Sequence, residues 1–224
     1  MVVISLGGSI VCGHEINSDY IKKFRNFLEE YSKHHKIFVV VGGGETARKY
    51  INVGKSLGFD QYLLDEIGIM ATRLNGSLLL GKYSYPRVAK NIPEAIIASG
   101  MYPVVVCGGT EPGHTTDGVA LLLAERAGEK KMINITSVGG VYTKDPNKFP
   151  DAKLIEKLSY EDAEKMFMER KMTAGLNLPF DLISLKIAER SNIAIYIIGP
   201  DIENLKKVIN NESFKGTVIG NLHM

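Results

Sequence analysis

Short apolar runs alternate along this chain with longer segments whose apolar residues recur at the spacing of an α-helix. The runs occupy residues 2–6, 37–41, 103–107, 132–136 and 193–198. Such continuously apolar strands, alternating with helices, are typical of a parallel sheet that is buried on both faces. We therefore expect the fold class α/β, as a three-layer α/β/α sandwich around a mainly parallel central sheet, with a further edge strand at 217–219.

The helical segments lie between these strands and after them. We expect them at residues 18–33, 45–52, 61–80, 93–99, 119–127, 159–170, 181–191 and 201–210. Ser18 stands where the N-cap of the first helix belongs. The helix over 61–80 carries an apolar stripe that offers enough surface for a subunit interface, made of Leu64, Ile67, Met70, Ala71, Leu74 and Leu78.

Three strands end in glycine-rich turns, at residues 7–9, 42–44 and 108–117. In an open parallel sheet, ligands bind beyond the carboxyl ends of the strands, where a helix N-terminus offers unpaired N–H groups to an anion. One phosphate needs one such turn, so three that converge indicate a long polyphosphate or two phosphorylated ligands placed end to end, the geometry of phosphoryl transfer. Taken alone, the third turn fits equally an ordinary loop in which Thr116 or Asp117 caps the next helix.

Composition narrows the function classes. Lysine plus arginine number 27 against 25 for aspartate plus glutamate in 224 residues, and the two signs are interspersed, so nucleic-acid binding is not indicated. Cys12 and Cys107 are too few for a disulfide framework and favour buried structural thiols. No signal sequence opens the chain and its apolar runs are shorter than the ~20 residues that span a bilayer, so we expect a cytoplasmic protein with no membrane contact.

Two common phosphate-binding motifs are disfavoured. The first turn lacks the G-x-G-x-x-G pattern of dinucleotide-binding folds. Residues 76–83 come close to a P-loop, but Tyr83 stands where serine or threonine must hold Mg²⁺, and leucines fill the middle of the segment. Another nucleotide-binding fold is therefore needed.

Six motifs occur in order along the chain, at residues 7–9, 41–48, 65–69, 108–117, 136–146 and 181–187. The most specific are G-G-T-E-P-G-H-T-T-D at 108–117 and G-V-Y-T-K-D-P at 140–146. Together they resemble the amino acid kinase family, and within it the UMP kinases of the archaeal type. The resemblance covers nearly the whole chain and implies a single domain, residues 1–224, with an acceptor lobe near 1–130 and an ATP lobe near 131–224.

The resemblance implies transfer of the γ-phosphoryl group of ATP to UMP, giving UDP and ADP in pyrimidine nucleotide biosynthesis, with Mg²⁺ on the ATP phosphates. It also implies a homohexamer. The identity of the acceptor is the less constrained part, and a carboxylate, a carbamate or an isoprenoid phosphate is the alternative within the family. A non-catalytic nucleotide-binding regulator on the same fold is the alternative from another class.

The site residues implied by the resemblance fall into three groups. The ATP side comprises Gly8, Ser9, Gly44, Arg48, Thr136, Tyr142 and Asp145. The UMP side comprises Gly43, Asp65, Thr110, Glu111, Pro112, Gly113, His114, Thr115 and Thr116. The catalytic group comprises Lys186 as the cation for the transferred group, with Asp117 and Asp181 orienting lysine or magnesium-bound water.

Each charged candidate also has a purely structural alternative. Arg48 and Asp65 both fit solvated helix positions. Asp117 and Asp181 both fit N-caps of the helices that they begin. Lys186 fits an ion-paired surface lysine.

The chain departs from the family pattern at two places. Many family members carry lysine two positions before the paired glycines of the first strand, where this chain has Ser5 followed by Leu6. The family more often has asparagine and aspartate where Ser137 and Gly139 stand. The first departure leaves open how the transferred group is stabilised. The second predicts weaker adenine or ribose contacts or a broader nucleotide preference. Without the resemblance, Tyr142 would be interpreted as a partly buried aromatic residue of a loop.

Overall fold

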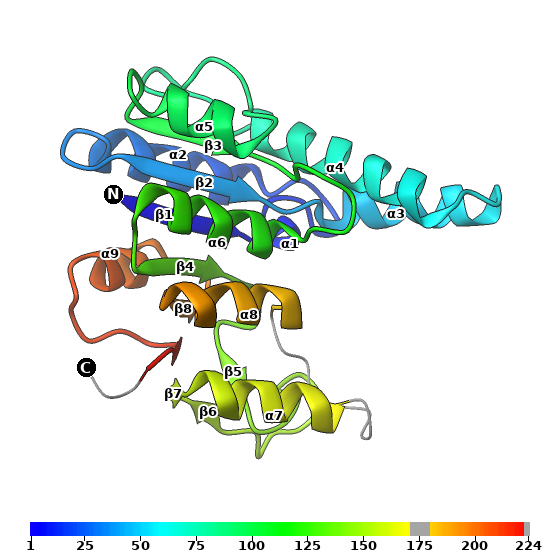
Figure 1. Cartoon of the computed structure of the whole chain (residues 1–224), viewed down its shortest axis with the longest axis vertical. Helices are drawn as coiled ribbons and strands as arrows, with labels where there is room; N and C mark the ends of the chain where they lie inside the picture. The colour runs from blue at the N-terminus through cyan, green and yellow to red at the C-terminus, as the bar shows by residue number, and fades with distance from the viewer. Residues whose placement is uncertain (171–179, 222–224) are drawn as a thin grey trace.

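The strands form one large sheet and one small one. The computed structural model describes residues 1–170 and 180–221. Within them, seven strands pair in the order β3-β2-β1-β4-β8-β9-β7 (Figure 1). Their bounds are β1 Val2–Leu6, β2 Ile37–Val41, β3 Val104–Cys107, β4 Lys131–Ile135, β7 Lys157–Leu158, β8 Ala194–Ile198 and β9 Thr217–Ile219. The small sheet pairs β5 (Val141–Tyr142) with β6 (Leu154–Ile155).

The large sheet is mainly parallel, as predicted. The neighbours β3, β2, β1, β4 and β8 all pair in parallel, and β9 runs antiparallel to β8. Parallel neighbours place their carboxyl ends at the same edge of the sheet. The turns at 7–9, 42–44 and 108–117 therefore all begin at one edge.

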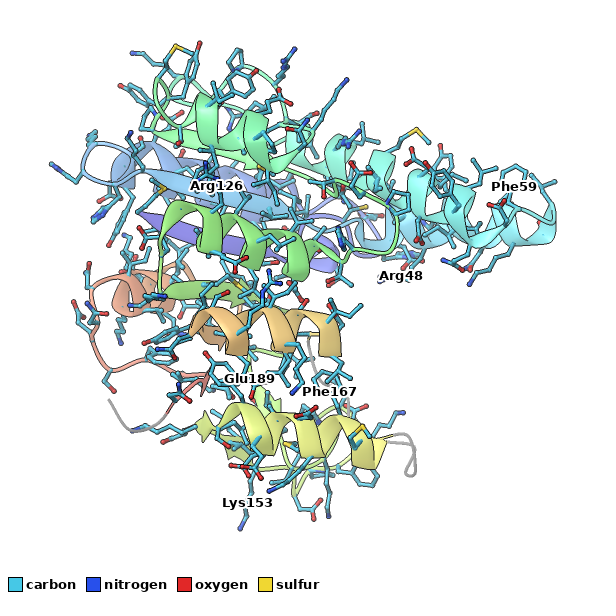
Figure 2. The ribbon with its side chains drawn as sticks, viewed as in Figure 1. Arg48, Phe59, Arg126, Lys153, Phe167 and Glu189 are labelled. Atoms are coloured by element: carbon cyan, nitrogen blue, oxygen red, sulfur yellow. The ribbon has the colours of Figure 1, made fainter. Side chains whose placement is uncertain are left out.

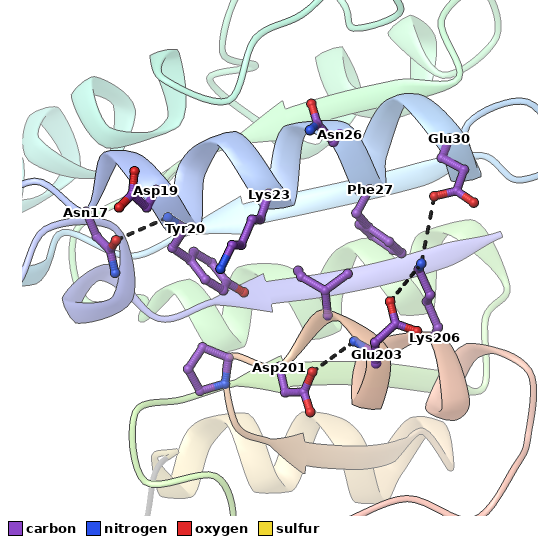
Figure 3. Close-up of a pocket in the computed structure, with 12 residues that line it drawn as sticks. Asn17, Asp19, Tyr20, Lys23, Asn26, Phe27, Glu30, Asp201, Glu203 and Lys206 are labelled. Carbon is purple, nitrogen blue, oxygen red and sulfur yellow. Dashed lines mark hydrogen bonds and ion pairs between the residues drawn. The ribbon is translucent and has the colours of Figure 1, made fainter.

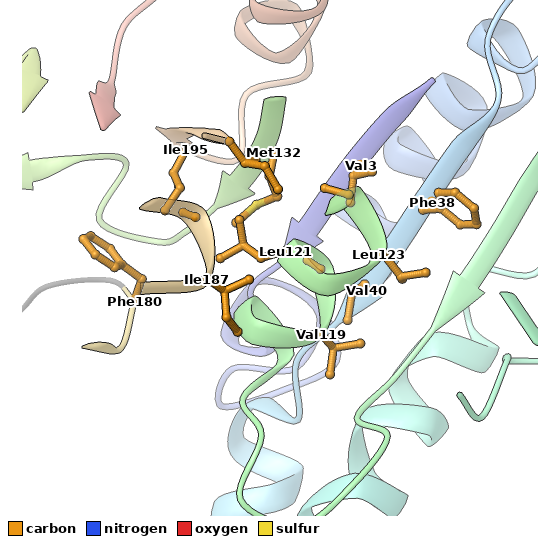
Figure 4. Packing of buried hydrophobic residues seen from close by; sticks show 14 of the residues in the cluster. Val3, Phe38, Val40, Val119, Leu121, Leu123, Met132, Phe180, Ile187 and Ile195 are labelled. Carbon is orange, nitrogen blue, oxygen red and sulfur yellow. The ribbon is translucent and has the colours of Figure 1, made fainter. Parts of the chain in front are cut away.

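Helices cover both faces of this sheet. One face carries α2 (Ser18–Tyr31) and α9 (Ile202–Ile209); the other carries α5 (Ile92–Ala98), α6 (Thr116–Ala127) and α8 (Leu182–Ser191). Side chains alternate along each strand, so Val3 packs in the cluster around α6 whereas Ile4 packs in the cluster under α2. Figure 4 shows the first cluster, with Leu121 of α6 at its centre. The predicted three-layer α/β/α sandwich is confirmed.

In the described residues, the remaining helices are α1, α3, α4 and α7. The short α1 (Gly8–Val11) follows β1, and α7 (Tyr160–Arg170) packs beside α8. The two helices α3 (Gly44–Ser56) and α4 (Gln61–Ser77) form a hairpin that extends away from the sheet (Figure 1). Figure 2 shows Phe59 at the tip of this hairpin and Arg48 near its base.

The apolar stripe predicted for α4 is only partly buried. Leu64 and Ala71 are buried, but Met70 is 57% exposed and Leu74 is 63% exposed. The helix instead buries the polar Thr72 against the rest of the chain. The hairpin therefore presents an apolar surface that the described residues leave uncovered.

Helix ends differ from the sequence prediction in detail. Ser18 is not the cap of α2, because Asn17 Oδ1 accepts from the backbone N–H of Tyr20 at 3.1 Å. The helix α1 and the strands β5, β6 and β7 were not predicted, since segments of two to four residues show no periodicity. Cys12 and Cys107 are buried and unpaired, as predicted. In the described part of the chain, every helix is too short or too polar to span a bilayer.

Candidate active site

The first two glycine turns lie against each other. Because β1 and β2 are neighbours, Gly8 meets the backbone of the 42–44 turn. A side-chain carbon on Gly8 would collide with backbone atoms of Gly42 and Gly44, and Gly44 has a φ of +59°, a conformation that favours glycine. The convergence predicted for these two turns is confirmed, and it brings the N-termini of α1 and α3 together.

A cavity of about 380 Å³ joins the second turn to the third. It lies between the start of α3, the first part of α4 and the loop from β3 to α6. The lining residues are Gly43, Gly44, Ala47, Ile51, Asp65, Gly68, Ile69, Thr72, Gly109, Glu111, Gly113, His114, Thr115 and Thr116. The structure thus brings together all the predicted acceptor residues except Thr110 and Pro112, and it adds α3 and α4 residues that no sequence motif marked.

Three side chains of α4 fasten the third turn over this cavity. The backbone N–H of Gly113 donates to Asp65 Oδ2 at 2.8 Å, and Gln61 donates to the other oxygen of Asp65 at 2.8 Å. Thr72 Oγ1 accepts from the backbone N–H of Gly109 at 2.7 Å. Neither Gln61 nor Thr72 lies in a sequence motif. The signal that could have identified Thr72 is a hydroxyl beside the apolar residues of a helix.

Thr115, Asp181 and Ser184 tie the N-terminus of α6 to that of α8. Thr115 caps α6 and donates its hydroxyl to Asp181 Oδ2 at 2.5 Å. Asp181 caps α8 by accepting from the backbone N–H of Ser184 at 2.9 Å, and Ser184 Oγ donates to the same carboxylate at 2.5 Å. The cap alternative for Asp181 is confirmed. The cap alternative is wrong for Thr116 and Asp117, because Thr115 holds that position.

The carboxyl group of Asp117 points from the first turn of α6 toward the sheet. Ser5 Oγ of β1 donates to its Oδ1 at 2.6 Å, and Asn134 Nδ2 of β4 donates to its Oδ2 at 3.3 Å. Burial raises the pKa of Asp117 to about 6; the negative charge of Asp181 adds to the rise, while the bonds from Ser5 and Asn134 oppose it. The middle of the sheet edge therefore holds a buried carboxyl group whose pKa lies well above that of an ordinary aspartate.

Both predicted cations are ion-paired. Arg48 Nε lies 2.8 Å from Glu45 Oε2, and its side chain is 58% exposed. Arg48 follows Gly44 by one helical turn, so it borders the side of α3 that lines the cavity. Lys186 Nζ lies 2.7 Å from Glu164 Oε2 and 2.9 Å from Glu189 Oε2, on the side of α8 that faces α7. The structure thus places Lys186 in the surface ion pairs given as its alternative, away from the lining of the acceptor cavity.

A second cavity, of about 680 Å³, lies beyond the carboxyl ends of β4 and β8. Of the predicted ATP residues, Tyr142 lines it. Thr136 instead accepts from the backbone N–H of Gly139 at 3.0 Å, and Asp145 is 5% exposed and accepts from that of Asn147 at 3.0 Å, so both shape the loop. Lining residues that sequence analysis did not select include Asn204, Lys207, Phe214 and Lys215, which belong to no motif.

The strand order sets these features in a row. The first cavity lies beyond β3 and β2, and the second lies beyond β4 and β8. The turn at 7–9 follows β1, the strand between β2 and β4, so Gly8 and Ser9 lie between the two cavities. Two ligands bound in the cavities would meet at this turn.

A third cavity lies between α2 and α9, the two helices that cover one face of the sheet (Figure 3), and has a volume of about 610 Å³. Tyr20 is one of its lining residues; its hydroxyl is buried with no hydrogen-bond partner among the described residues, and burial raises its pKa. Lys206 crosses it and pairs with Glu203 at 2.9 Å and Glu30 at 3.8 Å. None of the predicted site residues lines this cavity. Within residues 1–170 and 180–221, no three acidic, histidine or cysteine side chains gather as a metal site.

Comparison with known proteins places these features in a family. Residues 1–199 match the sequence profile of the Amino acid kinase family. The uridylate kinase of Thermoplasma acidophilum is 43% identical over 222 residues, which cover 97% of this chain and 96% of that protein. The uridylate kinase of Thermoplasma volcanium is 45% identical over 213 residues, which cover 94% of this chain and 93% of that protein.

Solved structures agree with the sequence matches. The crystal structure of uridylate kinase from Archaeoglobus fulgidus has a TM-score of 0.85 to this chain at 38% identity, covering 98% of this chain and 100% of that one. The crystal structure of UMP kinase from Bacillus anthracis has a TM-score of 0.78 at 19% identity, covering 99% of this chain and 96% of that one. At the lower identity the likeness shows the fold alone. The similarity therefore extends over the whole sheet, its edge and both cavities.

Proposed function

The chain belongs to the amino acid kinase family, and we infer that it is a UMP kinase, which transfers the γ-phosphoryl group of ATP to UMP and releases UDP and ADP. The observation that carries this inference is the row of two cavities separated by a glycine turn. Phosphoryl transfer requires a donor and an acceptor end to end, with the transferred group between them. A site for one nucleotide alone would not need the second cavity.

We propose that UMP occupies the cavity of about 380 Å³. Its phosphate would lie against the start of α6, where Thr115 caps the helix and the first-turn N–H groups favour an anion. Asp65 would accept from the ribose hydroxyls while it holds the 110–116 turn through Gly113. No base is needed to activate the acceptor, because the attacking phosphate oxygen is already an anion.

We propose that ATP occupies the other side, with its base in the cavity of about 680 Å³ beside Tyr142. The close packing of Gly8 against Gly44 brings the N-termini of α1 and α3 together, and their N–H groups would bind the ATP phosphates. Mg²⁺ bound to the ATP phosphates would neutralise part of their charge during transfer. In this arrangement the acceptor cavity is built from residues before 131 and the ATP cavity from residues after it, which supports the two predicted lobes.

The transfer itself depends on positioning and charge. Arg48 lies on α3 one helical turn after Gly44, and we propose that it leaves Glu45 to bind the phosphates. Asp117 and Asp181 hold the N-termini of α6 and α8 and thereby orient the groups at the junction. Lys186 would have to break two ion pairs to contact the phosphates, whereas Arg48 would have to break one. We therefore propose Arg48, and not Lys186, as the phosphate ligand.

We further propose that the uncovered apolar surface of the α3–α4 hairpin is a subunit interface within a homohexamer. The residues that are each more than half exposed on these two helices or at the C-cap of α3 are Tyr50, Val53, Leu57, Tyr62, Met70 and Leu74. Exposed apolar surface on this scale marks an interaction site in many proteins.

The activity is tested by incubating the purified protein with Mg²⁺-ATP and UMP and separating the nucleotides by anion-exchange chromatography. The proposal predicts equal amounts of UDP and ADP, and no ADP when UMP is omitted. ADP release without UDP would identify an ATPase or another acceptor. Tight ATP binding without any turnover would identify a regulator.

A further inference from the structure

Ser5 is a buried polar residue in the middle of an apolar strand. It is 1% exposed, and its neighbours Ile4 and Leu6 are fully buried. A hydroxyl in such surroundings needs a hydrogen-bond partner, since water cannot reach it. Its partner is Asp117, whose Oδ1 lies 2.6 Å away.

This bond connects the two halves of the proposed site. Ser5 lies two residues before the 7–9 turn that receives the donor phosphates. Asp117 follows Thr116, which lines the acceptor cavity. Asn134, which is in register with Ser5 on β4, donates to the second oxygen of the same carboxylate. The carboxylate therefore holds the start of α6 against two adjacent strands.

Among residues 1–170 and 180–221, the groups that act on Asp117 are neutral donors and one like charge. They are Ser5 from β1, Asn134 from β4 and, from the start of α8, Asp181. Within residues 1–170 and 180–221, no lysine or arginine forms an ion pair with Asp117. An ionised carboxylate accepts from both donors, whereas protonation turns one of its oxygens into a donor. The two bonds that Ser5 and Asn134 donate are therefore those of the ionised form.

We propose that Ser5 is a positioning residue for phosphoryl transfer, which acts through Asp117 to hold the acceptor turn in line with the donor turn. The inference rests on the proposed function. Ser5 thus has a positioning role at the place in β1 where many members of the family carry a lysine. Ser5 itself touches neither nucleotide.

The test is the pH dependence of kcat for UDP formation, from pH 5 to pH 9, in the wild type and in Ser5→Ala. Because the Ser5 bond lowers the pKa of Asp117, its loss should move the acidic limb of the profile upward by roughly one pH unit. The variant should lose roughly threefold in kcat at pH 6.5 and close to tenfold at pH 5, with the KM values for UMP and ATP changed much less. Ser5→Thr keeps a hydroxyl at this position and should restore the limb.

A matched control is Ser32→Ala. Ser32 is also a buried serine, but its hydroxyl donates to the backbone carbonyl of Glu29 at the far end of α2. Its loss should leave the pH profile unchanged. Ser5→Ala added to Asp117→Asn should cause no further loss, because Ser5 acts through Asp117.

Carboxyl carbon NMR supplies a readout that does not require turnover. The Asp117 resonance should titrate near pH 6 in the wild type and at higher pH in Ser5→Ala. The proposal is overturned if the folded Ser5→Ala variant keeps both the wild-type pH profile and the wild-type titration of Asp117. It is also overturned if the loss of kcat caused by Ser5→Ala adds fully to the loss caused by Asp117→Asn. A wild type that forms no UDP at any pH would instead refute the proposed function.

Discussion

Asp65 on α4 accepts a hydrogen bond from the backbone N–H of Gly113 at 2.8 Å, so a helix outside the sheet fixes the turn that closes the acceptor cavity. The same carboxylate is proposed to bind the ribose of UMP. Asp65→Asn keeps the size of the side chain but removes its charge and one acceptor. Loss of a charged hydrogen bond costs about 1.5–3 kcal/mol, so the KM for UMP should rise roughly 10- to 100-fold while the KM for ATP stays the same.

The matched control for this change is Asp60→Asn. Asp60 is the N-cap of the same helix and does not line the cavity. Asparagine caps a helix about as well as aspartate does, so this variant should keep wild-type kinetics. If both variants raise the KM for UMP equally, the effect comes from α4 as a whole and Asp65 has no specific role.

Gly44→Ala should abolish ATP binding or folding. Gly44 has a φ of +59°, and a side-chain carbon there would collide with the carbonyl oxygens of Gly8 and Cys12. Gly58 has a φ of +78° and open space around it, so Gly58→Ala carries the backbone strain without the collision. We expect Gly58→Ala to lose about 1 kcal/mol of stability and to retain activity. Thermal unfolding and ATP titration of the two variants separate the effects, and equal behaviour of both would contradict the phosphate cradle.

Arg48→Ala should affect catalysis far more than stability. Its ion pair with Glu45 is exposed, and such pairs add little to folding. If Arg48 binds the phosphates, its loss should reduce kcat/KM roughly 100-fold or more, as for the loss of other groups that stabilise developing charge. Lys49→Ala removes an adjacent exposed cation of the same helix and should have little effect. A variant Arg48→Ala with wild-type kinetics would exclude this residue from the site.

Asp117 should make stability fall as pH rises toward neutrality. Its pKa is raised from 3.8 to about 6, so the folded state favours the protonated form; the stabilisation is fully present below pH 4 and lost above about pH 6. A shift of this size corresponds to at most about 3 kcal/mol. We therefore expect Asp117→Asn to raise the free energy of unfolding, compared with the wild type, more at pH 7.5 than at pH 4.5. Urea unfolding of both proteins at the two pH values measures this difference.

Asp151→Asn provides the opposite case. The ion pair with Lys144 lowers the pKa of Asp151, so its contribution to stability is lost as pH falls through that value. Asp151 is exposed, and removing its charge should cause only a slight loss at neutral pH. The same sign of change for both variants would refute the burial of the Asp117 carboxyl.

The layers and the glycine turns could be predicted because their physical causes leave continuous signatures. A strand buried on both faces, such as Ile37–Val41, is apolar at nearly every position. A place where two backbones touch, such as Gly8 against Gly44, has to be glycine. The acceptor residues of the third turn followed from its motif, and the structure gathers most of them around one cavity.

Other features depend on partners distant in sequence. The cap of α6 is Thr115 and not its neighbour Thr116, because the backbone angles of the turn decide which hydroxyl faces the free N–H groups. Thr72 bonds to Gly109 only once α4 has docked beside β3. The ion pairs of Lys186 include Glu164 on a different helix. No spacing within one segment contains this information.

The central claim is that the acceptor cavity selects UMP. The most direct measurement is steady-state ADP formation from Mg²⁺-ATP with a panel of acceptors: UMP, CMP, dUMP, AMP, acetylglutamate, carbamate and isopentenyl phosphate. We predict a kcat/KM for UMP well above that for dUMP, acetylglutamate, carbamate and isopentenyl phosphate, since Asp65 and the 110–116 turn suit a ribonucleotide. Efficient turnover of a carboxylate, a carbamate or isopentenyl phosphate, with none of UMP, would contradict the account.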